Sequence, residues 1–300
     1  MPTLNTSMQG KICLVTGATS GIGKATAMGL AQRGAIVVMV GRDREKGEAV
    51  QREIKTKSGN EAVDLLLADL SSQESVRQLA ENFLQRYTKL HVLINNAGMS
   101  SLRRRETVDG LEMTFAVNQL APLLLTNLLL DVIKASTPSR IINVSSDAHE
   151  AGYINMDDLQ LERHTSFMRA YGQSKLALVL FTYELARRLQ GTAVTANCLH
   201  PGFVATNFGQ NGTGPIGRGV MNFLSSFGIS PEEGAKTSIF LATSPEVEGV
   251  TGKYFVKSIP KRSAPITYDE KLQRQLWEES ARLVKLPTTA FGDMSAHCAG

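Results

Sequence analysis

Apolar runs of strand length alternate with amphipathic runs of helix length from about residue 11 to residue 257. Short apolar runs are typical of buried strands, and a period near 3.6 residues is typical of a helix with one buried face. The expected strands are Lys11–Thr16, Ile36–Val40, Val63–Leu67, Val92–Asn95, Arg140–Val144, Val194–Leu199 and Lys253–Val256. The expected helices are Ile22–Arg33, Arg44–Lys57, Ser72–Arg86, Leu111–Ala135, Phe167–Leu189 and Glu232–Ala242.

This alternation predicts an α/β fold, namely a single-domain, Rossmann-type, doubly wound parallel sheet of about seven strands with helices on both faces. We expect an N-terminal extension at 1–9, one domain at 10–286 and a flexible tail at 287–300. An irregular stretch at about 203–230 follows the sixth strand, where a substrate lid would lie. The alternative for its apolar part, Val220–Phe227, is a packed core helix.

Composition narrows the class of protein. Of the 300 residues 42% are apolar and 20% charged, and the net charge is only +4, so disorder and a nucleic-acid partner are not indicated. Three cysteines show neither a disulfide framework nor the spacing of a metal site. No apolar leader and no run of about 18 apolar residues is seen. These features predict a cytoplasmic protein without a membrane anchor or a metal.

The glycine-rich segment after the first strand carries the first candidate chemistry. It reads Thr16-Gly17-Ala18-Thr19-Ser20-Gly21-Ile22-Gly23 and opens the first helix. Glycines at this junction let a pyrophosphate approach the helix N-terminus, where free N–H groups and the helix dipole favour negative charge. The alternative is an ordinary glycine turn. The strand–turn–helix context favours a dinucleotide site that includes Gly17, Thr19, Ser20, Gly21, Ile22 and Gly23.

Gly41-Arg42 stands at the end of the second strand, where an NAD-binding site would place a carboxylate for the ribose hydroxyls. A guanidinium binds a phosphate in a bidentate manner, so this pair favours NADP(H). Lys46 is a second candidate contact, although it is equally interpretable as a surface lysine. Asp43 argues against the interpretation, because a carboxylate would repel the 2′-phosphate.

With these motifs the sequence resembles the short-chain dehydrogenase/reductase family from about Gly10 to Val256. The motifs occur in the family's order: Thr16–Gly23, Asp69-Leu70, Asn95-Asn96-Ala97-Gly98, Asn118, Ser145-Ser146, Tyr171-Gly172-Gln173-Ser174-Lys175 and Pro201-Gly202. The 25 residues between Ser146 and Tyr171 and the strings Asn143–His149 and Ser174–Ala177 are similar to the retinol dehydrogenase-like branch. Several members of that branch begin with a membrane-anchoring helix, which is not seen here.

The resemblance implies the roles of individual residues. The catalytic group would be Asn118, Ser146, Tyr171 and Lys175, with Ser146 chosen over Ser145. Asn118 would bind a water through a kink in its helix. Besides the glycine turn, Arg42, Lys46, Tyr171 and Lys175, the coenzyme contacts would be Asp69, Leu70, Asn96, Ala97, Gly98, Pro201, Gly202, Val204 and Thr206. The substrate would contact Ser146, Tyr171, Met99, His149 and Phe203. A homodimer or homotetramer would form through the helices at 111–135 and 167–189.

The chemistry fits these residue types. Lys175 follows Tyr171 by one helical turn, so its cation would lower the pKa of the phenol from its ordinary value near ~10. Ser146 would donate to the substrate oxygen. The sequence therefore predicts an NADP(H)-dependent oxidoreductase that acts on a lipophilic aldehyde, ketone or retinoid-like alcohol. A cofactor-sensing regulatory protein without turnover is the alternative. A methyltransferase would not need this tyrosine and lysine, and a hydrolase would need a nucleophile elbow that is absent.

Overall fold

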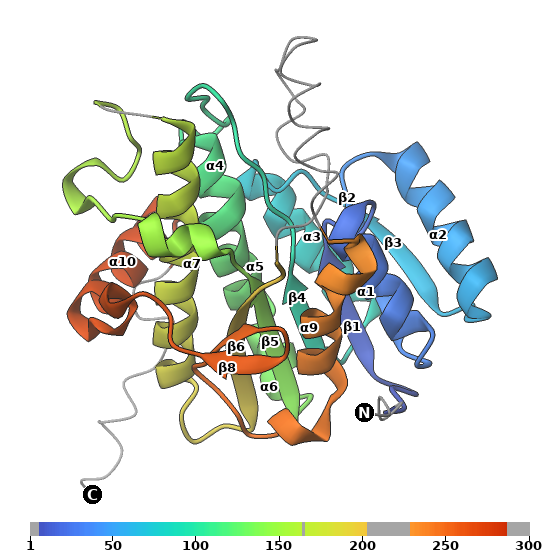
Figure 1. Ribbon diagram of the computed structural model, residues 1–300. Coiled ribbons are helices and arrows are strands. Elements are labelled where there is room, and N and C mark those ends of the chain that lie inside the picture. Colours follow the sequence, from blue (N-terminus) through green and yellow to red (C-terminus); the bar gives the residue numbers. More distant parts are fainter. Residues whose placement is uncertain (1–5, 164–165, 203–228, 287–300) are drawn as a thin grey trace, which may run out of the picture.

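The computed structural model describes residues 6–163, 166–202 and 229–286 (Figure 1). These residues contain eight strands in one sheet, in the order β3-β2-β1-β4-β5-β6-β7-β8. All neighbouring strands are parallel except β7 and β8. The strands are β1 (Ile12–Thr16), β2 (Ile36–Gly41), β3 (Val63–Leu67), β4 (Val92–Asn95), β5 (Ser139–Val144), β6 (Val194–His200), β7 (Tyr254–Val256) and β8 (Ile259–Lys261).

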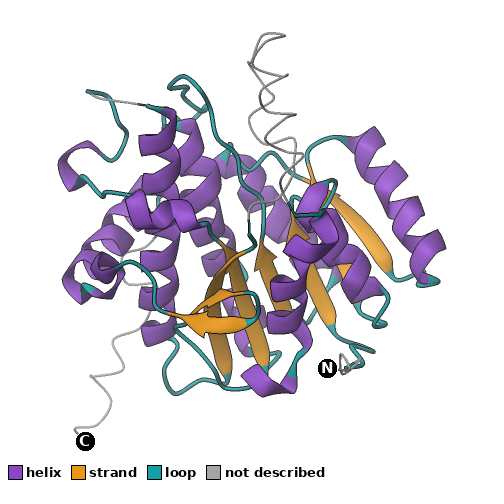
Figure 2. Cartoon of the chain, in the orientation of Figure 1, coloured by secondary structure: helices purple, strands orange, loops and turns teal. Residues whose placement is uncertain are grey.

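Helices cover both faces of this sheet (Figure 2). They are α1 (Gly21–Ala31), α2 (Arg44–Ser58), α3 (Gln73–Arg86), α4 (Met113–Phe115), α5 (Ala121–Leu128), α6 (Leu130–Lys134), α7 (Phe167–Arg188), α9 (Pro231–Thr243) and α10 (Glu270–Leu283). One buried apolar cluster joins the sheet to α1, α2 and α9, and another joins it to α3, α5, α7 and α10. Within the described ranges, every helix is too short or too polar to cross a bilayer.

The predicted single-domain, doubly wound α/β sheet is confirmed, and each of the seven predicted strands lies within one residue of its observed ends. The strand count is corrected from about seven to eight. The additional strand, β8, folds back on β7 through Lys257 and Ser258, whose φ angles are +51° and +61°. A three-residue, fully exposed strand that contains Pro260 carries neither an apolar alternation nor a glycine turn signal. The sequence pattern therefore could not reveal it.

The continuous helix predicted for Leu111–Ala135 is broken. Between α4 and α5 the backbone forms a π-helical turn at Ala116–Leu120, in which the amide of Ala121 donates to the carbonyl of Ala116. Pro122 follows at once, and it has no N–H to donate to the carbonyl of Asn118 four residues earlier. The helix kink expected at Asn118 is thus present, with proline as its cause.

Helix α10 was not predicted. Asp269 caps the start of this helix, because its side chain accepts hydrogen bonds from the amides of Lys271 and Leu272. The helix packs on α7: the ring of Trp277 stacks on Phe181 with centroids 5.5 Å apart. An N-capping Asp followed by buried positions at helical spacing is a recognisable signal, so this element could have been found from the sequence.

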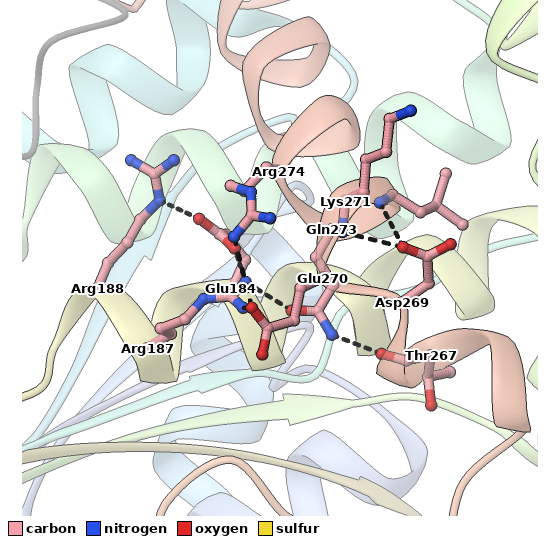
Figure 3. A network of polar contacts seen from close by, with 10 residues as sticks. Glu184, Arg187, Arg188, Thr267, Asp269, Glu270, Lys271, Gln273 and Arg274 are labelled. Atoms are coloured by element: carbon pink, nitrogen blue, oxygen red, sulfur yellow. Dashed lines mark hydrogen bonds and ion pairs between the residues drawn. The ribbon is translucent and has the colours of Figure 1, made fainter.

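Polar contacts also dock α10 on α7 (Figure 3). Arg187 of α7 donates to the side-chain oxygen of Gln273 at 2.7 Å and pairs with Glu270 at 3.0 Å. The buried carboxylate of Glu184 accepts from both Arg187 and Arg188. One face of α7 is therefore occupied by the chain's own C-terminal helix. A dimer that used this face would have to displace α10.

We expect α10 to belong to the cooperative core rather than to an accessory tail. Leu276 is fully buried, so Leu276→Ala should lower the free energy of unfolding by about 2–5 kcal/mol, since it leaves a cavity between α10 and α7. Urea unfolding should be followed by circular dichroism and by the fluorescence of Trp277, the sole tryptophan. The two transitions should coincide. Arg274→Ala, at an exposed position of the same helix, is the control and should change stability by less than about 0.5 kcal/mol. A fluorescence transition of Trp277 at a lower urea concentration than the circular-dichroism transition would contradict the expectation.

Candidate active site

The carboxyl ends of the parallel strands share one edge of the sheet. On one side of β1 the chain adds first β2 and then β3. It then returns to β1, and β4 pairs with the other side of that strand. The order of the strands reverses between β1 and β4, and ligands of open α/β sheets bind in the crevice outside such a reversal. The candidate residues from the ends of β1, β2, β3, β4, β5 and β6 are all carried to this edge.

The glycine turn after β1 has the backbone shape that the predicted phosphate site requires. Gly17 and Gly21 have φ angles of +66° and +52°. A Cβ at Gly23 would lie 2.3 Å from the carbonyl oxygen of Gly17, so a side chain there is excluded. Ser20 precedes α1 without capping it through its side chain, and the first turn of α1 has no acidic residue. The positive end of the helix dipole is thus left without a protein anion in its first turn, and it can accept a phosphate.

Asn96 and Thr16 tie the ends of β4 and β1 together. The side-chain amide of Asn96 donates to the carbonyl oxygen of Thr16 at 2.8 Å. The Thr16 hydroxyl in turn accepts from the amides of Asn96 and Ala97, each at 3.0 Å. These bonds hold the glycine turn against the floor of the crevice.

At the end of β2, glycine and arginine occupy different environments. A Cβ at Gly41 would lie 2.4 Å from the methyl carbon of Thr19, so Gly41 lets β2 approach the glycine turn. Arg42 is exposed and forms no ion pair with any described residue. The carboxylate of Asp43 caps α2 by accepting from the amide of Lys46 at 3.0 Å. The nearby acidic residue therefore has a structural role.

The other predicted adenosine contact lies at the end of β3. The exposed carboxylate of Asp69 accepts from the hydroxyl and the amide of Ser71, at 2.7 and 2.9 Å, through one of its oxygens. Leu70 beside it is half-buried.

Ser145 and Ser146 at the end of β5 have separate environments. Ser145 is buried, and its hydroxyl donates to the backbone carbonyl of Lys175 at 2.9 Å. The hydroxyl of Ser146 donates to the carboxylate of Asp147 at 2.9 Å, accepts from the amide of Ala148 at 3.2 Å, and is hydrogen-bonded to the side chain of Tyr171. The structure thus places Ser146, not Ser145, beside the tyrosine.

Lys175 and Asn118 are the other two predicted catalytic residues. The buried ammonium of Lys175 donates to the carbonyl of Val144 at 2.9 Å and lies 5.7 Å from the centre of the Tyr171 ring. The side-chain oxygen of Asn118 accepts from the amide of Met99, and its nitrogen donates to the hydroxyl of Ser174, at 2.8 and 2.9 Å. The four predicted catalytic residues are therefore brought together.

Gly98 completes this floor. A Cβ there would approach the Lys175 ammonium to 3.3 Å and the Asn118 side-chain oxygen to 3.5 Å. A side chain at position 98 would therefore crowd the lysine from the crevice side.

Burial sets the protonation of the two titrating groups. It raises the pKa of Tyr171 to about 12; the hydrogen bond from Ser146 opposes this rise, and the charge of Asp147 adds to it. Burial also lowers the pKa of Lys175 to about 8. The predicted lowering of the tyrosine pKa by Lys175 is thus wrong for the protein's own groups, because withdrawal from water disfavours both tyrosinate and ammonium.

Some of the remaining predicted residues are described by the structure and others are not. Pro201 and Gly202 directly follow β6 and are half-buried, and Met99 is half-buried beside Gly98. Phe203, Val204, Thr206 and nearly all of the predicted lid lie outside the described residues. Among the described residues, no three side chains of His, Cys, Asp or Glu are grouped as metal ligands.

His149, expected as a substrate contact, is held between two segments of the backbone. Its side chain is fully buried, and the ring lies 4.7 Å from that of Tyr254. One ring nitrogen is 2.7 Å from the carbonyl oxygen of Ser146, and the other accepts from the amide of Ala264 at 3.2 Å. The ring's connection to Ala264 could not be read from the sequence, because the two residues are 115 positions apart.

An open α/β sheet with a glycine turn at its reversal point and a serine, tyrosine and lysine beside it defines the class of α/β dehydrogenases. Comparison with known proteins identifies the family. Residues 11–214 match the family model described as short chain dehydrogenase. Retinol dehydrogenase 13 of Homo sapiens is 46% identical over 286 residues, which cover 93% of this chain and 86% of the relative.

Solved structures agree. An uncharacterised protein from Mycobacterium paratuberculosis superposes with a TM-score of 0.77 at 32% identity, covering 94% of this chain and 96% of its own. The active-site complex of Pseudomonas aeruginosa RhlG with NADP has a TM-score of 0.66 at 28% identity, covering 83% and 95%. The chain belongs to the short-chain dehydrogenase family, in its retinol dehydrogenase-like branch, and is an oxidoreductase.

Three histidines predict how stability depends on pH. The rings of His91, His149 and His200 each accept a backbone N–H, and burial lowers the pKa of all three. Below about pH 6.5 the unfolded chain therefore binds more protons than the folded one, so the free energy of unfolding should fall from pH 7.5 to pH 5.5. Urea titrations at each pH measure it.

A matched variant isolates one histidine. In His91→Asn an amide oxygen can accept from the amide of Ile12 at any pH, so the slope of stability against pH should become shallower. Stability that stays level or rises on acidification would show that the buried rings do not resist protonation.

Proposed function

We propose that this protein transfers hydride between NADP(H) and a carbonyl or alcohol carbon, with Tyr171 as acid and base. The observation that carries the proposal is the meeting of Ser146, Tyr171 and Lys175 at the edge of the sheet where the glycine turn lies. A regulatory protein that only senses the coenzyme would need the glycine turn alone. It would not need a hydrogen-bonded serine and tyrosine with a buried lysine behind them.

The residues present fit a phosphorylated dinucleotide. The space that a Cβ would fill at Gly23 and the uncompensated N-terminus of α1 suit the pyrophosphate. Arg42 suits a 2′-phosphate, because its guanidinium is exposed and forms no ion pair with the described residues, while Asp43 is engaged as a helix cap. Lys46 is exposed on the first turn of α2 and could add a second positive charge. When bound, the coenzyme supplies or accepts the hydride.

The protein's own groups then handle the oxygen and its proton. Ser146 donates a hydrogen bond to the substrate oxygen, which stabilises the negative charge that develops there. Tyr171 gives its hydroxyl proton to that oxygen as the carbon–hydrogen bond forms, and solvent returns the proton afterwards. Lys175, held by the carbonyl of Val144, lies 5.7 Å from the centre of the Tyr171 ring, where its positive charge would offset part of the penalty that burial places on the tyrosinate left behind.

The protonation states favour one direction. A tyrosine with a pKa near 12 is fully protonated at neutral pH and is ready to act as an acid. Oxidation of an alcohol needs the tyrosinate as base, which burial disfavours. The site without coenzyme is therefore set to give a proton, as carbonyl reduction requires. The similarity to retinol dehydrogenase 13 points to retinoid-like aldehydes and alcohols as the substrate class.

Coenzyme choice is tested at Arg42. Arg42→Ala should weaken NADPH binding by about 1.5–3 kcal/mol, because a charge-assisted bond to the phosphate is lost, and should leave NADH binding nearly unchanged. Fluorescence titration of each coenzyme measures this. Arg44→Ala is the matched control, since Arg44 is exposed and pairs with Glu48. Equal affinity of the unaltered protein for NADH and NADPH would refute the choice of NADP(H).

The proton donor is tested at Tyr171. Tyr171→Phe keeps the ring but removes the transferable hydrogen, so kcat for the reduction of retinal by NADPH should fall by about 10²- to 10⁴-fold while NADPH still binds. Tyr153→Phe, at an exposed tyrosine, should keep full turnover. Coenzyme binding without turnover of any carbonyl by the unaltered protein would instead support the sensing alternative. A Tyr171→Phe variant that stays active would show that another group donates the proton.

A further inference from the structure

His149 joins the turn that carries Ser146 to the C-terminal part of the chain. Because one ring nitrogen, Nε2, accepts from the amide of Ala264 at 3.2 Å, the proton of the neutral ring lies on Nδ1. Nδ1 therefore donates to the carbonyl oxygen of Ser146 at 2.7 Å. The ring is fully buried, so both bonds form where water does not compete. It bridges two backbone segments in one fixed tautomer.

The connection continues from Ala264 to α10. The carbonyl of Ala264 accepts from the hydroxyl of Thr267 at 2.6 Å. The carbonyl of Thr267 accepts from the side-chain nitrogen of Gln273 at 2.7 Å, and the side-chain oxygen of Gln273 accepts from Arg187 at 2.7 Å. Figure 3 shows the last two steps, where Gln273 lies between Thr267 and Arg187. Thr267 is fully buried and Gln273 nearly so.

The two ends of this path lie in different parts of the chain. Ser146 lies within residues 11–214, the part matched by the family model, and Ala264, Thr267 and Gln273 lie beyond it. The C-terminal segment Ser263–Leu283 packs on α7 and reaches the serine turn through the ring of His149. Its contact with the site is made to the backbone of Ser146 and does not involve the hydroxyl, which lies beside Tyr171.

We propose that His149 is a positioning residue through which the docked C-terminal segment fixes Ser146 for hydride transfer. This inference rests on the proposed function. Because α10 also packs on α7, which carries Tyr171 and Lys175, an effect of α10 on the reaction does not by itself identify this path; its dependence on His149 does. Because the ring holds both segments, a disturbance of α10 at Gln273 should reach Ser146, and should do so only while His149 is present.

The test is a double-mutant cycle at His149 and Gln273. In His149→Asn the side-chain nitrogen can still donate to the carbonyl of Ser146, but no group reaches Ala264. Gln273→Leu removes both bonds of the glutamine. Each change alone should lower kcat for retinal reduction, His149→Asn by up to about 100-fold and Gln273→Leu by about 3- to 10-fold. The dissociation constant of NADPH should not change, since the glycine turn has no part in the path.

The decisive measurement is whether the effects of the two substitutions on kcat depend on each other. In the His149→Asn background, Gln273→Leu should have no further effect on kcat. Two effects that multiply independently would overturn the proposal, because they would mean that each residue acts only through local stability. Arg274→Ala is the control on the same helix and should leave kcat unchanged. Thr267→Val removes the hydroxyl that bonds the carbonyl of Ala264 and, with it, a bond to the hydroxyl of Ser263. It replaces Gln273→Leu in the cycle if that variant folds poorly.

Hydrogen exchange tests the same link without turnover. Gln273→Leu should speed exchange of the amides of Ala148 and His149 in the unaltered background, but not in His149→Asn. If the unaltered protein reduces no carbonyl, the proposed function fails, and the exchange cycle alone decides whether the link exists. If Gln273→Leu leaves amide exchange at Ala148 unchanged both in the unaltered protein and in His149→Asn, the link is refuted even in an active enzyme.

Discussion

The parallel pairing of β1 with β4 is the constraint on which the site depends. Because the strands on either side of this pair are added outwards in opposite directions, their carboxyl ends leave a crevice that no crossover helix fills. The glycine turn comes from the end of β1, and Ser146 comes from the end of β5. Tyr171 and Lys175 arrive from α7, and the lysine is anchored to the last carbonyl of β5. Three distant parts of the chain thus form one site.

Burial gives that site its chemical character. The same withdrawal from water raises the pKa of Tyr171 and lowers that of Lys175. Burial therefore disfavours the charged form of both groups. Such a site holds a neutral acid, ready to protonate an oxygen that has received hydride. An alcohol would need the opposite, a tyrosinate. The cationic ring of the oxidised coenzyme would favour that form, which makes the coenzyme part of the acid–base system in the oxidation direction.

The sequence was informative wherever local order determines structure. The strand periodicity predicted the sheet, and the glycine spacing and the Tyr171–Lys175 spacing predicted residues that the fold does bring together. It was uninformative where contacts between distant residues decide. The burial that raises the tyrosine pKa and the bond from His149 to Ala264 depend on packing that no local pattern contains. Helix α10 lies between these two cases. Its capping Asp and its apolar spacing are visible in the sequence, but they follow the last of the recognised motifs.

The central claim is that hydride passes at this edge of the sheet while the protein supplies only a proton. Transfer of deuterium from NADPH labelled at the transferring position of nicotinamide C4 tests it most directly. Mass spectrometry of the alcohol formed from retinal in ordinary water should find one deuterium, bound to the carbinol carbon, in every molecule formed with the correctly labelled face. In the converse experiment, with unlabelled NADPH in deuterated water, that carbon should carry none. An alcohol whose carbinol hydrogen came from solvent would contradict the account.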